Sequence, residues 1–87
     1  MPAMMLTIAP NPFSSATVAR FTLAHPSNWE LRLYDLLGKL LLKRDGHGAG
    51  EQQIRLDEPN LPTGCYRLEL RTPSGAASKA VYVRGRI

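Results

Sequence analysis

Turn-forming residues interrupt this chain about every 8–15 residues, and this spacing restricts it to short regular segments. The interruptions are clusters of proline, glycine, asparagine and aspartate at residues 10–12, 25–28, 37–38, 45–48, 58–60, 62–64 and 73–75. Proline fixes φ and lacks an amide donor, and glycine adopts positive φ without steric cost, so both favour turns. Seven short segments lie between the clusters, and none has a convincing helical period. The pattern is typical of an all-β sandwich or barrel.

Four of the segments alternate between apolar and polar residues, which predicts strands with one buried face. In residues 65–71, for example, tyrosine and leucine occupy every second position and charged residues the others. Residues 17–23, 29–35 and 51–57 alternate in the same way. The predicted core consists of Phe21, Trp29, Leu31, Leu33, Leu40, Ile54, Leu56, Tyr66, Leu68 and Leu70.

Two segments leave alternatives open. Residues 39–43 contain three consecutive leucines, so a helix starting near Asp35 competes with a strand. Gly38 and the short distance to the next glycine cluster favour the strand. The last segment, residues 76–84, can turn either of two pairs inward, Val81 with Val83 or Ala80 with Tyr82.

Short amphipathic strands cannot bury their apolar faces singly, and two antiparallel sheets packed face to face solve that problem. We therefore predict a seven-stranded antiparallel immunoglobulin-like β-sandwich. A mass of 9.6 kDa suits a single domain, which we expect over residues 5–87, with residues 1–4 as a linker stub or an added start. The paired cysteines typical of antibody domains are missing, since the chain has one cysteine.

The reactive residues of the chain do not form a recognisable catalytic or metal-binding pattern. Cys65 is alone, so it forms neither an intrachain disulfide nor a multi-cysteine zinc site, and we expect it to be small and semi-buried. Asp57 and Glu58 are adjacent and would point to opposite sides of a strand. An enzyme would need Cys65 or Asp57 to meet His25 or His47. We expect no enzyme activity, cofactor, metal or nucleic-acid partner.

We interpret two further features, the glycine string and Trp29, as structural and not as binding motifs. Gly46, Gly48 and Gly50 form a GxGxG string, which cradles phosphate only at the junction of a strand and a helix. A strand is predicted to follow here, so we expect a long hairpin loop. Trp29 is suited to stacking on a sugar, but its alternation with Leu31 predicts burial in the core.

The net charge of +4 is concentrated near the C-terminal end. Residues 1–70 carry seven basic and seven acidic side chains, and the rest carries only basic ones, namely Arg71, Lys79, Arg84 and Arg86. Such a strand is either a solvated edge that resists aggregation or a docking surface for an acidic partner. We expect no transmembrane segment and no secretory signal at the start, because apolar runs fall well short of about 20 residues.

Several motifs, taken together and in order, resemble a known family. They are Pro10-Asn11-Pro12-Phe13, WELRLYDLLGK at residues 29–39, AGE at 49–51, NLPTGCYRL at 60–68 and SKAVYV at 78–83. The chain closely resembles the type A C-terminal sorting domain of the type IX (Por) secretion system of Bacteroidetes, over nearly its whole length.

The resemblance implies a seven-stranded immunoglobulin-like sandwich at the C-terminal end of a larger exported cargo protein. By this resemblance, the cargo passes through the periplasm, and the domain directs it through the outer-membrane translocon to the cell surface or the medium. A sortase-like peptidase then removes the domain. The alternative function is an immunoglobulin-like carbohydrate-binding or spacer module of a secreted enzyme, which would require Trp29 and Tyr34 to be exposed.

The resemblance also places the recognised terminal motif in the last strand. Contact with the translocon is expected through basic side chains meeting acidic surfaces or through strand pairing at the edge. The residues predicted for this contact are Lys79, Val81, Val83, Arg84 and Arg86. The residues predicted to form the motif turns are Pro10, Asn11, Pro12, Gly38, Pro62 and Gly64.

Overall fold

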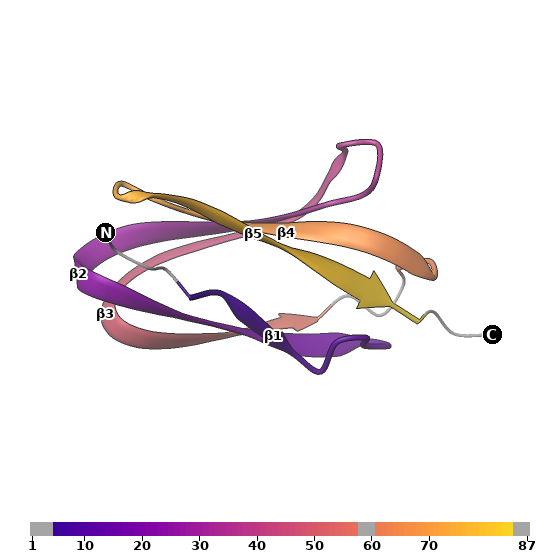
Figure 1. Cartoon of the computed structure of the whole chain (residues 1–87), viewed down its shortest axis with the longest axis horizontal. Coiled ribbons are helices and arrows are strands. Elements are labelled where there is room, and N and C mark those ends of the chain that lie inside the picture. Colours follow the sequence, from indigo (N-terminus) through magenta and orange to yellow (C-terminus); the bar gives the residue numbers. More distant parts are fainter. Residues whose placement is uncertain (1–4, 58–60, 85–87) are drawn as a thin grey trace.

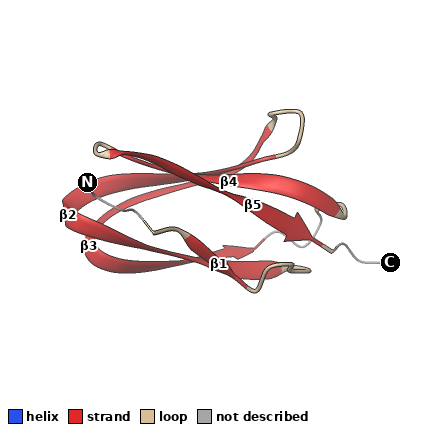
Figure 2. Cartoon of the chain, viewed as in Figure 1, coloured by secondary structure: helices blue, strands red, loops and turns tan. Residues whose placement is uncertain are grey.

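The structure, a computed structural model, describes residues 5–57 and 61–84, and these ranges contain five strands and no helix. The strands are β1 (Thr7–Ala9), β2 (Ala16–Tyr34), β3 (Leu40–Asp57), β4 (Gly64–Thr72) and β5 (Gly75–Val83). All pairings between them are antiparallel. The prediction of an all-β antiparallel fold is confirmed (Figure 2), and residues 35–39 form a turn rather than the alternative helix. The described residues include no helix able to span a membrane.

Five strands replace the predicted seven because two pairs of predicted segments join. Residues 17–23 and 29–35 fall almost wholly within β2, and residues 39–43 and 51–57 fall almost wholly within β3. The join in β2 is marked by a register shift between Leu23 and Ser27, where three residues of β2 face one residue of β3. Such a bulge bends a strand without ending its pairing. The proline at residue 26 therefore marks a bend, not the end of a strand.

The bend places the two halves of β2 in opposite layers (Figure 1). Residues 16–23 of β2 pair with β1 and with residues 50–57 of β3. Residues 30–34 of β2 pair with β4, which in turn pairs with β5, while residues 40–48 of β3 lie on the other side. The two layers face one another, and each contributes one apolar face to the interior.

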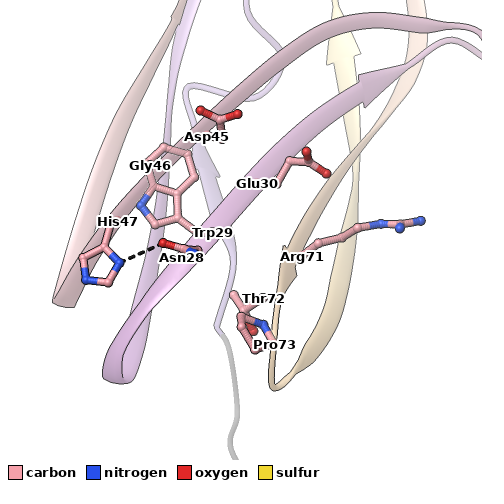
Figure 3. A pocket seen from close by; sticks show the side chains of 9 residues that line it. All are labelled: Asn28, Trp29, Glu30, Asp45, Gly46, His47, Arg71, Thr72 and Pro73. Carbon is pink, nitrogen blue, oxygen red and sulfur yellow. Dashed lines mark hydrogen bonds between the residues drawn. The ribbon is translucent and has the colours of Figure 1, made fainter.

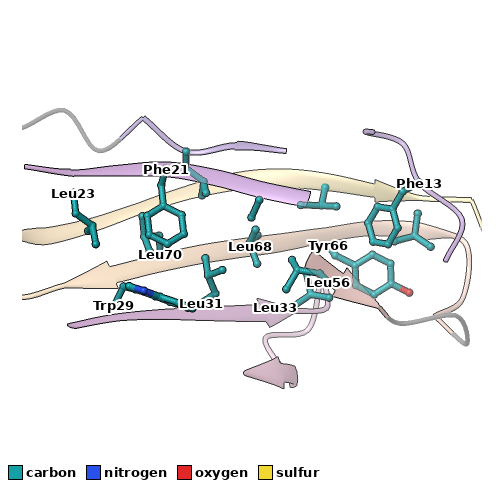
Figure 4. Packing of buried hydrophobic residues seen from close by; sticks show 14 residues of the cluster. Phe13, Phe21, Leu23, Trp29, Leu31, Leu33, Leu56, Tyr66, Leu68 and Leu70 are labelled. Atoms are coloured by element: carbon teal, nitrogen blue, oxygen red, sulfur yellow. The ribbon is translucent and has the colours of Figure 1, made fainter. Parts of the chain in front are cut away.

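The core lies between these layers and follows the predicted alternation (Figure 4). Phe21 from one layer meets Trp29 from the other edge to face, with ring centroids 5.4 Å apart. Most predicted core residues are buried, and Val81 and Val83, rather than Ala80 and Tyr82, face inward from β5. The interior also contains residues outside the predicted core set, namely Leu6, Phe13, Ala19, Leu23, Val81 and Val83.

Two predicted core residues are less buried than expected. Leu40 is 44% exposed, because it begins β3 directly after the turn, where a second register shift occurs opposite Leu33 and Tyr34. Ile54 is only partly buried and packs against the edge of the core. The prediction for Leu40 was wrong, since alternation could not locate its face next to an irregular register.

The glycine string is part of β3 rather than a hairpin loop, and this prediction was also wrong. Gly46 pairs with Trp29 and Gly48 pairs with Ser27. A Cβ atom on Gly46 would lie 2.6 Å from Cζ2 of Trp29, so the glycine provides the space that the indole fills. Gly50, at φ +74°, pairs with Leu23 beside the bulge. The glycines therefore serve the bend of the β2–β3 pair.

Candidate functional site

The predicted recognition residues of β5 are divided between the core and the surface. The side chains of Val81 and Val83 are 2% and 0% exposed, so a partner cannot reach them in the folded domain. Lys79 and Arg84 are exposed. Arg86 lies outside the described residues. The accessible features are therefore Lys79 of β5, Arg84 directly after the strand, outward side chains such as Tyr82, and the backbone edge.

One half of that backbone edge is covered by Asn11 and Phe13, which we call the clasp. The Asn11 amide accepts a hydrogen bond from Tyr82 N (2.9 Å) and donates one to the carbonyl of Ala80 (3.3 Å). Phe13 N donates to the carbonyl of Tyr82 (3.0 Å), and Arg84 N donates to the carbonyl of Phe13 (2.8 Å). The clasp thus takes the place of a neighbouring strand along residues 80–84. Further along the edge, Ala77, Ser78 and Lys79 line a groove together with Met5, Leu6 and Thr7.

Sequence reasoning assigned Asn11 to a turn and missed its contact with β5. An asparagine side chain can replace a peptide group because it carries both an amide N–H donor and a carbonyl acceptor, but nothing near residue 11 in the sequence indicates which strand it contacts. The flanking Pro10 has its own role, since its carbonyl accepts a hydrogen bond from the buried hydroxyl of Thr17 at 2.7 Å. With Pro12 completing the segment, this motif fixes the chain between β1 and β2 against the last strand.

The other residues predicted to form motif turns are Gly38, Pro62 and Gly64, and hydrogen bonds stabilise the chain around each of them. Gly38 has φ +87° in the turn between β2 and β3, a conformation that favours glycine. The carboxylate of Asp35 caps this turn by accepting hydrogen bonds from the amides of Leu37 and Lys39, each 2.9 Å long. Pro62 accepts a hydrogen bond from the hydroxyl of Tyr66 just after Gly64 starts β4. Burial raises the pKa of that Tyr66 hydroxyl.

The outward faces of β2, β3 and β4 form a layer of interlocked charges, which we call the outer face. Glu30 contacts Arg32 at 2.7 Å and Lys43 at 3.1 Å, and the hydrogen bond from Lys43, reinforced by Arg32, keeps the pKa of Glu30 below its ordinary value. Glu69 contacts Arg71 at 2.9 Å and Arg67 at 3.9 Å. Four cations therefore surround two carboxylates, which leaves this group of side chains with a positive charge.

Tyr34 connects the two halves of the outer face. Its hydroxyl accepts a hydrogen bond from Arg32 Nη1 at 3.3 Å and donates one to Glu69 at 3.5 Å. The guanidinium of Arg67 lies over its ring, 4.9 Å from the centroid. Tyr34 is half-buried beneath these groups, so its ring is not an open platform for a sugar.

An open groove lies where the bend of β2 and β3 approaches the turn between β4 and β5 (Figure 3). Trp29 forms part of its wall but is only 8% exposed, and its Nε1 has no hydrogen-bond partner among the described residues. His47 Nδ1 and Asn28 Oδ1 lie 2.8 Å apart beside it. The buried ring of Trp29 argues against the stacking that a carbohydrate-binding module would need.

The residues considered for catalysis are not brought together. Cys65 is exposed, not semi-buried as predicted, and pairs with Tyr82 near the start of β4. His47 belongs to the bend, and Asp57 is engaged with Arg55 at 2.9 Å. In residues 5–57 and 61–84, no group of three or more histidine, cysteine, aspartate or glutamate side chains is arranged to hold a metal ion.

A family model described as a secretion system C-terminal sorting domain matches residues 7–84. This range begins at the first residue of β1 and ends one residue after β5, so it contains all five described strands. No curated protein matches the chain.

Proposed function

The chain belongs to the family of C-terminal sorting domains of the type IX secretion system, and from this premise we propose how it acts. It is the sorting signal that directs a larger cargo protein, attached on its N-terminal side, from the periplasm through the outer-membrane translocon. A sortase-like peptidase then removes the domain, and the cargo reaches the cell surface or the medium. The observation that carries this proposal is the family match across all five strands.

The proposed fold of this sorting domain is an immunoglobulin-like sandwich. Seven predicted segments correspond to β1, β4, β5 and the two halves each of β2 and β3. The bend at Leu23 and Ser27 puts these halves into opposing layers, which supports this interpretation.

We propose that the translocon reads the last strand through Lys79, Arg84 and Arg86. Two of these cations are exposed in the described structure, and no acidic residue occurs after residue 69. The valines of the predicted set, Val81 and Val83, would act indirectly by anchoring the strand in the core. Pairing with a receptor strand would use the edge near residues 76–78, because the clasp occupies residues 80–84.

The test fuses residues 5–87 to a periplasmic reporter in a bacterium with a working type IX system. Export of the reporter to the surface or medium is the expected result, and a reporter that stays in the periplasm would refute the sorting proposal. Replacing Lys79, Arg84 and Arg86 with glutamate should then reduce export at least about tenfold, because the charge complementarity reverses.

Arg20→Glu is the control for Lys79→Glu alone, since each variant reverses one exposed cation and Arg20 lies on β2. It should leave export within about twofold of the parent, because it does not touch β5. Equal loss in both variants would mean that overall charge matters and that the last strand is not the recognised element.

A further inference from the structure

The turn between β2 and β3 ends in two unusually exposed leucines, Leu36 and Leu37, which we call the leucine tip. Their exposed fractions are 79% and 94%. Figure 1 shows this magenta loop standing clear of the two layers. An exposed leucine is common by itself, but two adjacent ones at the summit of a projecting turn form a concentrated apolar surface.

The turn holds the leucine tip in a fixed shape. Asp35 accepts hydrogen bonds from the backbone amides of Leu37 and Lys39, both at 2.9 Å, through its carboxylate. Gly38 N donates to the carbonyl of Asp35 (3.1 Å), and Asp35 N donates to the carbonyl of Lys39 (3.0 Å). A contact made by the leucines therefore requires little ordering of the chain on binding.

The segment from the tip to Arg44 combines apolar and basic character, and Asp35 and Asp45 flank it on either side. Residues 36–44 read LLGKLLLKR, with five leucines, three cations and no carboxylate. Leu40, the first residue after the turn, is 44% exposed. Lys39 and Arg44 are exposed, and the carboxylate of Asp35 is occupied by the backbone amides. Because the side chains of Lys39 and Arg44 are long and flexible, their charges can stay in water while the two leucines of the tip enter an apolar phase.

A lipid surface fits these features better than a protein pocket does. Arginine, tyrosine and tryptophan dominate the energetics of protein interfaces, and leucine is under-represented at their hot spots. A bilayer needs no shape complementarity, so it accepts a convex tip of any outline, and its anionic headgroups attract nearby lysine and arginine. Tyr34, at the base of the turn with Arg67 over its ring, is a residue type common at the level of headgroups.

We propose that the leucine tip inserts into the surface of an anionic phospholipid membrane, with Lys39 and Arg44 against the headgroups. This contact is separate from the reading of the last strand by the secretion machinery. It would hold the domain, and a cargo attached to it, at a membrane surface in a fixed orientation.

The test measures partition of the purified 87-residue chain onto vesicles by sedimentation. Vesicles of about 30% phosphatidylglycerol in phosphatidylcholine should bind the chain at least about tenfold more strongly than phosphatidylcholine alone, and added salt should weaken binding. Leu36→Ser combined with Leu37→Ser should reduce partition about 30-fold or more, because most of the apolar area that enters the bilayer is lost. Lys39→Gln should reduce it about threefold to fivefold.

Met5→Ser is the matched control, since Met5 is also an exposed apolar residue, at 69%, but lies away from the turn. It should change partition by less than about twofold. Far-ultraviolet circular dichroism should be the same for all variants, because each replaced side chain is exposed.

Several results would overturn the proposal. They are the absence of binding to anionic vesicles, equal binding to the uncharged ones, and equal partition of the double serine variant. Loss of export by the double serine variant, together with no vesicle binding by the parent, would place the tip in a protein pocket instead. The vesicle experiment contains no secretion machinery, so its failure and the failure of the sorting proposal are distinguishable.

Discussion

The β2–β3 and β4–β5 hairpins of this domain differ in both path and tip. The β2–β3 hairpin bends through both layers and ends in exposed leucines, whereas the β4–β5 hairpin stays in one layer and ends in Pro73 and Ser74. Each turn is closed by a side chain that bonds to the backbone. Asp35 accepts from two amides, and the hydroxyl of Thr72 accepts from Ser74 N at 3.1 Å. Polar residues therefore suffice to close a turn in this fold, and the leucine tip is not needed for that purpose.

The largest expected difference between the hairpins is in how much each leucine contributes to stability. Leu68, on β4, is 1% exposed, and Leu42, on β3, is only partly buried. Leu68→Ala should lower the free energy of unfolding by about 3 kcal/mol and Leu42→Ala by about 1 kcal/mol, because a cavity forms only at the first site. Urea unfolding followed by tryptophan fluorescence measures both. Equal losses would show that Leu42 packs as tightly as Leu68 and would contradict the difference in burial.

The bend of the β2–β3 hairpin can be tested at its glycines. Gly46→Ala should cost about 2 kcal/mol, since the new Cβ would lie 2.6 Å from an indole carbon of Trp29 that is packed against Phe21. Gly48→Ala is the control, because its Cβ would meet only the end of the flexible Gln52 side chain. The control should lose about 0.5 kcal/mol or less in thermal unfolding. A similar loss for both would mean that the indole moves aside freely.

The two turns should respond differently to removal of their capping side chains. Asp35→Ala removes the acceptor of two amide hydrogen bonds and should cost about 1 kcal/mol, whereas Thr72→Ala should cost about 0.5 kcal/mol. Asp35→Asn keeps an acceptor oxygen and should recover most of the loss. Chemical denaturation of the three variants checks this, and an alanine variant as stable as the asparagine variant would contradict the capping role.

The smallest expected effect concerns pH and the outer face of the β2–β3 hairpin. The pKa of Glu30 in the folded chain is lowered from an ordinary value of 4.5, chiefly by the hydrogen bond from Lys43. A lowered pKa means that the ionised form stabilises the fold above the unfolded value and that this contribution disappears as pH falls through the folded value. The difference in melting temperature between the parent and Glu30→Gln should therefore shrink between pH 6 and pH 3. A constant difference would show that the ion pairs add no stability.

Alternation along the chain predicted the regular parts of both hairpins. Leu31, Leu33, Leu68 and Leu70 face the core as expected, because each lies in a stretch with unbroken register. Side chains alternate between the two faces of a strand, so unbroken register is all that is needed to predict which residues face the core. The same reasoning failed at Leu40, where the register shifts beside the turn.

Features that depend on contacts between distant segments could not be read from the pattern. The glycine string resembles a loop in sequence, and only the position of Trp29 explains why Gly46 belongs in a strand. Alternation could not predict the facing of β5, because either Val81 with Val83 or Ala80 with Tyr82 fits it, and only the packed core shows that the valines are buried. Lys79 and Arg84 were predicted at the surface from charge alone, but the clasp of Asn11 on Tyr82 spans 71 positions and has no local signature.

The clasp has a consequence for proteolytic processing. A cut before residue 5 would leave Asn11 and Phe13 in place, so residues 80–84 would keep their cover. A cut after Phe13 would remove both residues and free the backbone groups of Ala80, Tyr82 and Arg84 that they now satisfy. An exposed strand edge of this kind can pair with a strand of another chain and so lead to aggregation. If a peptidase removes the domain as proposed, the position of the cut decides whether the released domain stays monomeric or aggregates through this edge.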